Sequence, residues 1–209
     1  MSGKRFTLLA EGSTDESLIP ILLWLWRQHR PSDELVEAQF ADPDYINIRS
    51  RRLVDRIGPA CDLYPCDVLF IHRDADRGSP DARVNEINGA VEKAFSGGTA
   101  PSAVCVVPVR MTEAWLLFHE SALRKAADNP NGEQALNLPK LSQIESLPDP
   151  KQTLRDLLRA ASGLPPQRLR RFREDRAARL VTQFIEDFSP LRKLSAFRRL
   201  EKEFTGLCL

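Results

Sequence analysis

The chain has 209 residues, which is enough for one sizeable hydrophobic core with a helical appendage but too few for several independent domains. Hydrophobic residues make up 42% of the sequence and charged residues 28%, a balance that is typical of globular proteins and excludes a largely disordered chain. The net charge is +1, but residues 1–100 hold 12 basic against 16 acidic residues (net −4), and residues 101–209 hold 18 against 13 (net +5). This asymmetry is compatible with an acidic catalytic half and a basic half that faces nucleic acid, and equally with solvated helices.

The first segment predicts the opening of an α/β fold. Residues 5–10 (RFTLLA) form an apolar run that predicts a strand ending at Glu11 and Gly12. A helix is expected next, capped by Ser13 or Thr14 and continued by the apolar run over residues 18–26. The N-terminus does not have the pattern of a signal peptide, and no stretch approaches the roughly 20 apolar residues of a membrane span, so we expect no membrane partner.

The middle of the chain predicts alternating strands and helices. Residues 35–40 predict a second strand and residues 49–57 a basic amphipathic helix. The clearest strand is expected at residues 67–72 (DVLFIH), whose continuous apolar run is typical of a parallel strand covered on both faces. A helix over residues 81–95, a Gly-rich loop over 96–101 and a strand over 103–109 follow. The alternation predicts an α/β fold with a central, mostly parallel sheet flanked by helices.

After this last strand the predicted elements are mainly helical. Thr112 is expected to cap a helix over residues 113–118, and residues 128–150, rich in Asn, Pro and Gly, predict a loop or lid. Further helices are expected over residues 152–161, 167–188 and 191–204. The expected organisation is an α/β domain at residues 1–127, the loop or lid at 128–150, and a basic helical extension at 151–209 that packs on the α/β domain.

Acidic residues follow two of the predicted strands: Glu11 follows the first, and Asp74 and Asp76 follow the strand at residues 67–72. In an open parallel sheet the carboxyl ends of the strands line the binding crevice, so these side chains are expected to converge. On an extended segment, two residues that are two positions apart point to the same side. An all-oxygen site of this kind suits Mg²⁺ or Mn²⁺. Alternatively, Glu11 caps a helix and the two aspartates are solvated in a loop.

The combination of these motifs resembles the TOPRIM domain of primases, topoisomerases, OLD-type nucleases and small relatives found in bacterial defence loci. The resemblance lies in residues 11–16 (EGSTDE) and 69–76 (LFIHRDAD), with further similarity to the small OLD-like group at 108–117 (PVRMTEAWLL) and 149–151 (DPK). It implies a metal-dependent endonuclease that cleaves phosphodiester bonds in phage defence. It also implies a separate ABC or SMC-like ATPase partner, which fits the lack of a Walker A motif in this sequence.

The resemblance implies roles that the chemistry also supports. Asp74 and Asp76 would hold the metal ion, and Glu11 would bind it or act as a general acid or base. Glu113 would add a carboxylate to the same crevice, or alternatively would stabilise the start of its own helix. Lys151 would stabilise negative charge on the scissile phosphate, or alternatively is a solvated residue at a helix start.

Arginines are the predicted nucleic-acid contacts. Arg73 and Arg77 flank the acids, whereas a buried structural role is expected for His72. Residues 151–179 hold nine Lys or Arg against three acidic residues, a net of +6, so this stretch is a candidate surface for the phosphate backbone of nucleic acid, with DNA favoured over RNA. The residues assigned to this contact are Arg168, Arg170, Arg171 and Arg173. A solvated helix face or an acidic protein partner are the alternatives.

The four cysteines do not have the spacing of a zinc site and predict reduced thiols in a cytoplasmic protein. Two other functions compete with the nuclease. One is a non-catalytic nucleic-acid-binding or sensor subunit whose acids bind a metal ion for structure. The other is a haloacid-dehalogenase-like phosphatase, which is disfavoured because Gly78 occupies the position of the usual Thr and because Glu11 would have no role. The sequence leaves the oligomeric state open, a homo-oligomer included.

Overall fold

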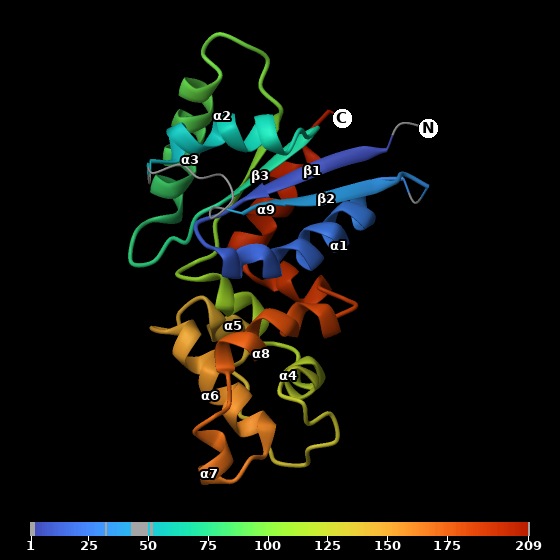
Figure 1. Cartoon of the computed structure of the whole chain (residues 1–209), viewed down its shortest axis with the longest axis vertical. Coiled ribbons are helices and arrows are strands. Elements are labelled where there is room, and N and C mark those ends of the chain that lie inside the picture. The colour runs from blue at the N-terminus through green and yellow to red at the C-terminus, as the bar shows by residue number, and fades with distance from the viewer. Residues whose placement is uncertain (1–2, 32, 43–49, 51, 209) are drawn as a thin grey trace.

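The computed structural model describes residues 3–31, 33–42, 50 and 52–208. Its centre is a parallel sheet of four strands, β1 (Lys4–Leu9), β2 (Val36–Ala41), β3 (Val68–His72) and β4 (Ser102–Val106), in the order β2-β1-β3-β4 (Figure 1). Strand β1 is central, and its Phe6 lies opposite Ala38 of β2 and Val68 of β3. The predicted α/β fold with a parallel sheet is therefore confirmed.

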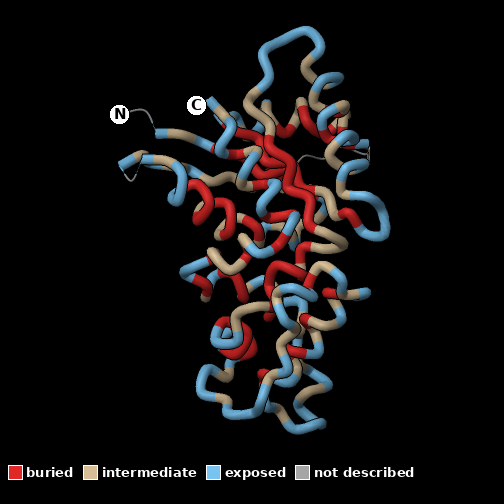
Figure 2. Tube along the Cα trace, turned by 180° about the vertical axis from the view of Figure 1, so that it is seen from behind, coloured by how far each residue is buried: buried red, intermediate tan, exposed pale blue. Residues whose placement is uncertain are grey.

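Helices cover both faces of the sheet. On one face, Phe6 and Phe70 belong to a core shared with α1 (Ile19–His29) and α9 (Ser195–Thr205). On the other face, Leu9 and Ile71 belong to a core with α2 (Leu53–Leu63) and α3 (Pro80–Ala94). Strand β3 is buried along its whole length and lies in the buried centre of the molecule seen in Figure 2. Burial on both faces explains why residues 68–71 are continuously apolar rather than alternating.

The first helical segment differs from its predicted start. The chain enters a 3₁₀ helix, η1 (Ser13–Leu18), before α1 begins at Ile19. Gly12 occupies the cap position, and its N–H donates to the Asp15 carboxylate at 3.0 Å. The expected cap at Ser13 or Thr14 is therefore wrong, because the acid in the first turn satisfies the free backbone N–H instead.

Two other expected helices also differ. Helix α2 begins at Leu53, and residues 49 and 51 of the segment predicted to be helical lie outside the described residues. The helix expected at Thr112 is a 3₁₀ turn, η2 (Thr112–Leu116), capped at Met111 without a side-chain hydrogen bond. Thr112 does not cap it because its hydroxyl faces His72 and Asp74.

The single helix expected over residues 167–188 is wrong. The structure has three short helices there, α7 (Pro166–Leu169), α8 (Glu174–Leu180) and η3 (Val181–Phe184). A new helix begins at Glu174, because Glu174 and Asp175 lie in its first turn, where negative charge is favourable.

The remaining helices are α4 (Glu120–Ala126), α5 (Leu141–Ile144), α6 (Pro150–Ser162) and η4 (Ser189–Lys193). Helices α4 and α6–α8 lie at the end of the molecule away from the sheet, whereas α9 returns to the sheet (Figure 1). There Phe204 packs on Phe70 with ring centroids 5.8 Å apart, and the Glu203 carboxylate accepts the backbone N–H of Cys105 on edge strand β4 at 3.0 Å. The last helix thus completes one sheet face and partly satisfies an edge.

Within the predicted loop or lid, α5 anchors the chain through the buried Ile144, and the adjacent Glu145 accepts hydrogen bonds from the backbone N–H groups of Ser195 and Ala196. In the part of the chain that the structure describes, no helix has both the length and the apolar character needed to span a bilayer.

Candidate active site

The predicted acids lie at the switch point of the sheet. From β1 the chain passes to β2 on one side and later to β3 on the other, so the carboxyl ends of β1 and β3 form the crevice where open α/β sheets bind ligands. Glu11 follows β1, and Asp74 and Asp76 follow β3. Turn η2, which carries Glu113, follows β4 at the same end.

Asp74 is held by the start of η2. Its Oδ1 accepts the backbone N–H of Thr112 at 3.0 Å and the Thr112 hydroxyl at 3.3 Å. The backbone carbonyl of Asp74 accepts Nε of Arg83, a residue of α3, at 3.1 Å. Thr112 therefore fixes the side chain of Asp74, and Arg83 fixes its backbone.

His72 links two carboxylates. It is 1% exposed, which confirms the expected burial, and its Nδ1 lies 3.0 Å from the carbonyl oxygen of Val106. Because a carbonyl oxygen only accepts, Nδ1 donates to it. Nε2 lies 3.1 Å from the Thr112 hydroxyl, 3.5 Å from Oδ1 of Asp74 and 3.8 Å from Oδ1 of Asp15.

The charge around Asp74 is predominantly negative. The pKa of the Asp74 carboxyl is raised from 3.8 to about 7, mainly by burial. The charge of His72 lowers this pKa, and the charges of Asp15, Glu113 and Glu11 raise it. A carboxylate with this pKa lacks sufficient positive charge nearby. The site therefore favours the arrival of either a proton or a cation.

The other two predicted metal ligands have arginine partners. Oε1 of Glu11 lies 2.9 Å from Nε of Arg73. Nη2 of the same arginine lies 3.2 Å from Oε1 of Glu86. Oδ2 of Asp76 lies 3.7 Å from Nη2 of Arg83. The φ angle of Asp76 is 51°, in the left-handed region, so the extended conformation expected through Asp76 is wrong. Arg73 neutralises two acids here and is not a free phosphate contact.

The described residues contain no group of three or more His, Cys, Asp or Glu that is arranged to hold a metal ion. Glu11, Asp74 and Asp76 therefore do not form a ready ligand set while arginines occupy two of them. The donor chemistry nevertheless fits, because carboxylate oxygens are the ligands that Mg²⁺ and Mn²⁺ prefer and the cluster around Asp74 has excess negative charge.

Glu113 and Lys151 come together beside this cluster. Nζ of Lys151 lies 3.6 Å from Oε1 of Glu113, and both residues line a cavity of about 40 Å³ together with Asp15 and Arg179. A cavity of this size holds water molecules or a small ion. Lys151 is placed there by α6, which Asp149 caps by accepting the N–H of Gln152 at 2.8 Å.

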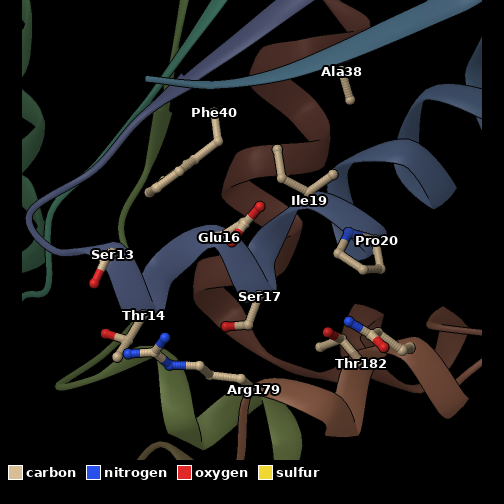
Figure 3. Close-up of a pocket in the computed structure, with 11 residues that line it drawn as sticks. Ser13, Thr14, Glu16, Ser17, Ile19, Pro20, Ala38, Phe40, Arg179 and Thr182 are labelled. Carbon is tan, nitrogen blue, oxygen red and sulfur yellow. The ribbon is translucent and has the colours of Figure 1, made fainter. Parts of the chain in front are cut away.

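A larger pocket of about 390 Å³ adjoins the cavity, between η1, β2 and η3 (Figure 3). Arg179 lines both spaces, and its side chain lies beside Thr14 in Figure 3. Thr182 also lines the pocket, and its buried hydroxyl has no hydrogen-bond partner among the described residues. The site thus continues from the acids into a space with one arginine and a free hydroxyl.

Most of the other predicted nucleic-acid contacts lie away from the acids. Arg77 is the exception, since it is exposed near Asp76. The other four are exposed in and around α7 and in the segment before α8. These four are Arg168, Arg170, Arg171 and Arg173. The helical residues Arg155 and Arg159 are instead paired, with Asp175 and Glu174.

Sequence reasoning missed Asp15, Thr112 and Arg179 as residues of the site. Asp15 stands within the EGSTDE motif, so the motif itself was the signal, but the residue was interpreted only as a favourable charge at a helix start. Comparisons of the chain with protein-family models, with curated proteins and with solved structures find no match. The resemblance to TOPRIM proteins therefore rests on the sequence motifs alone.

Proposed function

We propose that this protein is a nuclease of the TOPRIM type that uses Mg²⁺ or Mn²⁺ to cleave phosphodiester bonds in nucleic acid. The observation that carries the proposal is the carboxylate cluster around Asp74 at the switch point of the sheet. Burial above all, together with the neighbouring acids, raises the pKa of the Asp74 carboxyl to about 7, and a divalent cation would stabilise this carboxylate in its ionised form. The cations of Lys151 and Arg179 border the same cavity, where a phosphate would need them.

In this proposal Asp74 and Asp76 would hold the metal ion, and Glu11 would bind it or act as a general acid or base. The ion would supply Lewis acidity and lower the pKa of bound water. Binding would require Glu11 to separate from Arg73 and Asp76 from Arg83. As a base, Glu11 would take the proton of the attacking water while the bond from phosphorus to the leaving sugar oxygen breaks and that oxygen takes a proton from solvent. Lys151 would orient a phosphate oxygen.

The surroundings keep Asp74 in place during these steps. Thr112 donates to its carboxylate through both the backbone N–H and the hydroxyl, and His72 is fixed by Val106. DNA as the substrate, a partner ATPase and a role in phage defence are part of the proposal through the motif resemblance. A cytoplasmic location is also proposed, in keeping with the four free thiols.

A non-catalytic nucleic-acid-binding or sensor subunit is the second candidate. It is favoured by the ion pairs that engage Glu11 and Asp76, and by the lack of a ready group of three metal ligands in the described residues. In that case the arginines would be permanent structural partners of the acids.

A cleavage assay separates the two candidates. Purified protein, alone and with any genomically adjacent ATPase, would be incubated with supercoiled plasmid, linear duplex and structured RNA in Mg²⁺, Mn²⁺ or EDTA. We expect metal-dependent cleavage that falls about 100-fold or more in Asp74→Asn, since metal activation of water contributes several kcal/mol to the barrier. Asp62→Asn is the matched control, because this exposed residue of α2 loses the same charge away from the site.

The nuclease is refuted if Asp74→Asn cleaves as fast as the unchanged protein, or if the protein with its partner cleaves none of the substrates. Binding without cleavage would then favour the sensor subunit. Lys151→Met tests the phosphate contact separately, and we expect it to reduce cleavage less than Asp74→Asn does.

A further inference from the structure

A second pocket lies in the helical end of the molecule, away from the sheet. It has a volume of about 580 Å³ and is bounded by the end of α4, by α7 and α8, and by η3. Figure 1 shows α4, α7 and α8 at the end of the molecule opposite α2 and α3. Pockets that bind small molecules and cofactors typically measure about 300–1,000 Å³. The volume is therefore sufficient for a nucleotide.

The pocket, hereafter the arginine pocket, is strongly basic. Five cations line it, together with one carboxylate, that of Asp128. All five are exposed, and none of their side chains has an ion pair or hydrogen bond within the described residues. The five are Lys125, Arg168, Arg171, Arg173 and Arg176. Like charges gathered without counterions create a potential that attracts anions, and arginine binds phosphate through two parallel hydrogen bonds.

One wall of the arginine pocket is apolar. Phe172, Leu180 and Phe184 line it, and each is half-buried, with one side packed on the hydrophobic core. A ring with one free face suits stacking against a nucleobase, as in proteins that bind single strands through aromatic residues and a basic groove. Phosphate-binding cations and a stacking surface thus occur in one pocket.

A row of arginines connects the arginine pocket with the candidate active site. Arg173 and Arg176 also line a neighbouring hollow of about 500 Å³ that includes Arg179, and Arg179 lines the small cavity that holds Asp15 and Glu113. The three arginines are spaced by three residues along α8 and its cap, so they share one side of the helix over about 9 Å.

We propose that the arginine pocket binds one unpaired nucleotide of a single-stranded nucleic acid, whose phosphates then follow Arg173, Arg176 and Arg179 toward the acids. A duplex fits less well because base pairing and stacking hide the base faces that the apolar wall would contact. Delivery of a scissile phosphate to the acids rests on the proposed nuclease function, but nucleotide binding in the pocket does not.

The test is fluorescence anisotropy with a labelled oligonucleotide of about 12 nucleotides, in EDTA so that no cleavage occurs. The same sequence as a duplex, a 5′-mononucleotide and inorganic phosphate serve as competitors. We expect the single strand to bind at least about fivefold more tightly than the duplex. Arg171→Gln combined with Arg176→Gln should weaken binding about 10-fold or more, and Phe172→Leu about fivefold, the lower range of one lost stacking contact.

Arg27→Gln is the matched control. Arg27 is exposed on α1 and lines neither the arginine pocket nor the row of arginines, so losing the same charge there should change affinity less than about twofold. Thermal unfolding of each variant verifies that the fold is intact. A loss in Arg27→Gln equal to that in Arg171→Gln, or no loss in a folded Phe172→Leu, would overturn the pocket as a nucleotide site.

The competitors distinguish the possible ligands. Equal affinity for duplex and single strand would reject recognition of an unpaired base. A mononucleotide that binds as tightly as the oligonucleotide would overturn the proposed strand as the ligand and indicate a free nucleotide in its place. If the unchanged protein binds the oligonucleotide but cleaves nothing in Mg²⁺ or Mn²⁺, with or without its partner, only the nuclease function fails. If cleavage is metal-dependent but insensitive to the pocket variants, only the pocket proposal fails.

Discussion

Asp74→Asn should stabilise the metal-free protein at alkaline pH. Because Asp74 binds its proton more tightly in the folded protein than in the unfolded chain, its contribution to the free energy of unfolding falls as the pH rises from about 4 to about 8. One pKa unit corresponds to about 1.4 kcal/mol, so a rise from 3.8 to about 7 corresponds to an upper limit of about 4 kcal/mol. Asparagine removes the charge and keeps an acceptor for the N–H of Thr112.

We expect Asp74→Asn to raise the free energy of unfolding by about 2–4 kcal/mol at about pH 8. At about pH 4 we expect almost no difference, because the side chain at position 74 is then neutral in both folded proteins. For a chain of this length the gain corresponds to a rise of at least about 5 °C in the unfolding temperature. Urea and thermal unfolding at several pH values in EDTA measure it, with Asp62→Asn as the matched loss of an exposed charge. Adding Mg²⁺ should make the unchanged protein the more stable of the two, because Mg²⁺ stabilises the unchanged protein, which binds it, and not Asp74→Asn.

The reasoning is refuted if the two proteins show the same dependence of stability on pH. That result would mean that the carboxyl of Asp74 titrates in its ordinary range, and that the acids at the switch point carry no excess negative charge. The main physical support for a cation site would then be lost, whatever the cleavage assay shows.

Two further predictions test how α9 is held. Phe204→Ala should lower the free energy of unfolding by about 3–5 kcal/mol, because the fully buried ring packs on Phe70 and on Trp26, and urea denaturation measures this loss. Glu145→Ala should cost about 1–2 kcal/mol, because it leaves the N–H groups of Ser195 and Ala196 at the start of α9 without their carboxylate acceptor; an unchanged unfolding midpoint would contradict this.

The sheet could be predicted from the sequence because its strands are buried on both faces. Residues 68–71 are apolar at every position because they lie between two helical layers, and this leaves a pattern that needs no knowledge of the partners. The position of Glu11 and Asp74 at one end of the sheet follows from the same pattern, since parallel strands place their carboxyl ends together.

The details of the site could not be predicted, because they depend on contacts between distant residues. The sequence does not reveal that Arg73 pairs with Glu11 across two strands, or that Thr112 donates to Asp74. The left-handed φ of Asp76 also could not be predicted. The sequence Ala75-Asp76-Arg77 is equally compatible with an extended segment and gives no sign of a positive φ. Periodicity likewise missed the start of α8, because it describes the apolar face and not the acids that favour the start of a new helix.

The arrangement of charge suggests how metal and nucleic acid would depend on each other. The acids at the strand ends are partly neutralised by Arg73 and Arg83, whereas the five cations that line the arginine pocket have no acidic partners among the described residues. A phosphate that follows Arg173, Arg176 and Arg179 brings negative charge toward Asp15 and Glu113, which is unfavourable unless a cation lies between them. A cation in turn binds more tightly when phosphate oxygens complete its ligands, as Mg²⁺ commonly requires. Since such coupling is reciprocal, the metal ion and the nucleic acid would each raise the protein's affinity for the other by the same factor. The phosphate oxygens of the substrate would then complete the set of metal ligands that the protein supplies only in part.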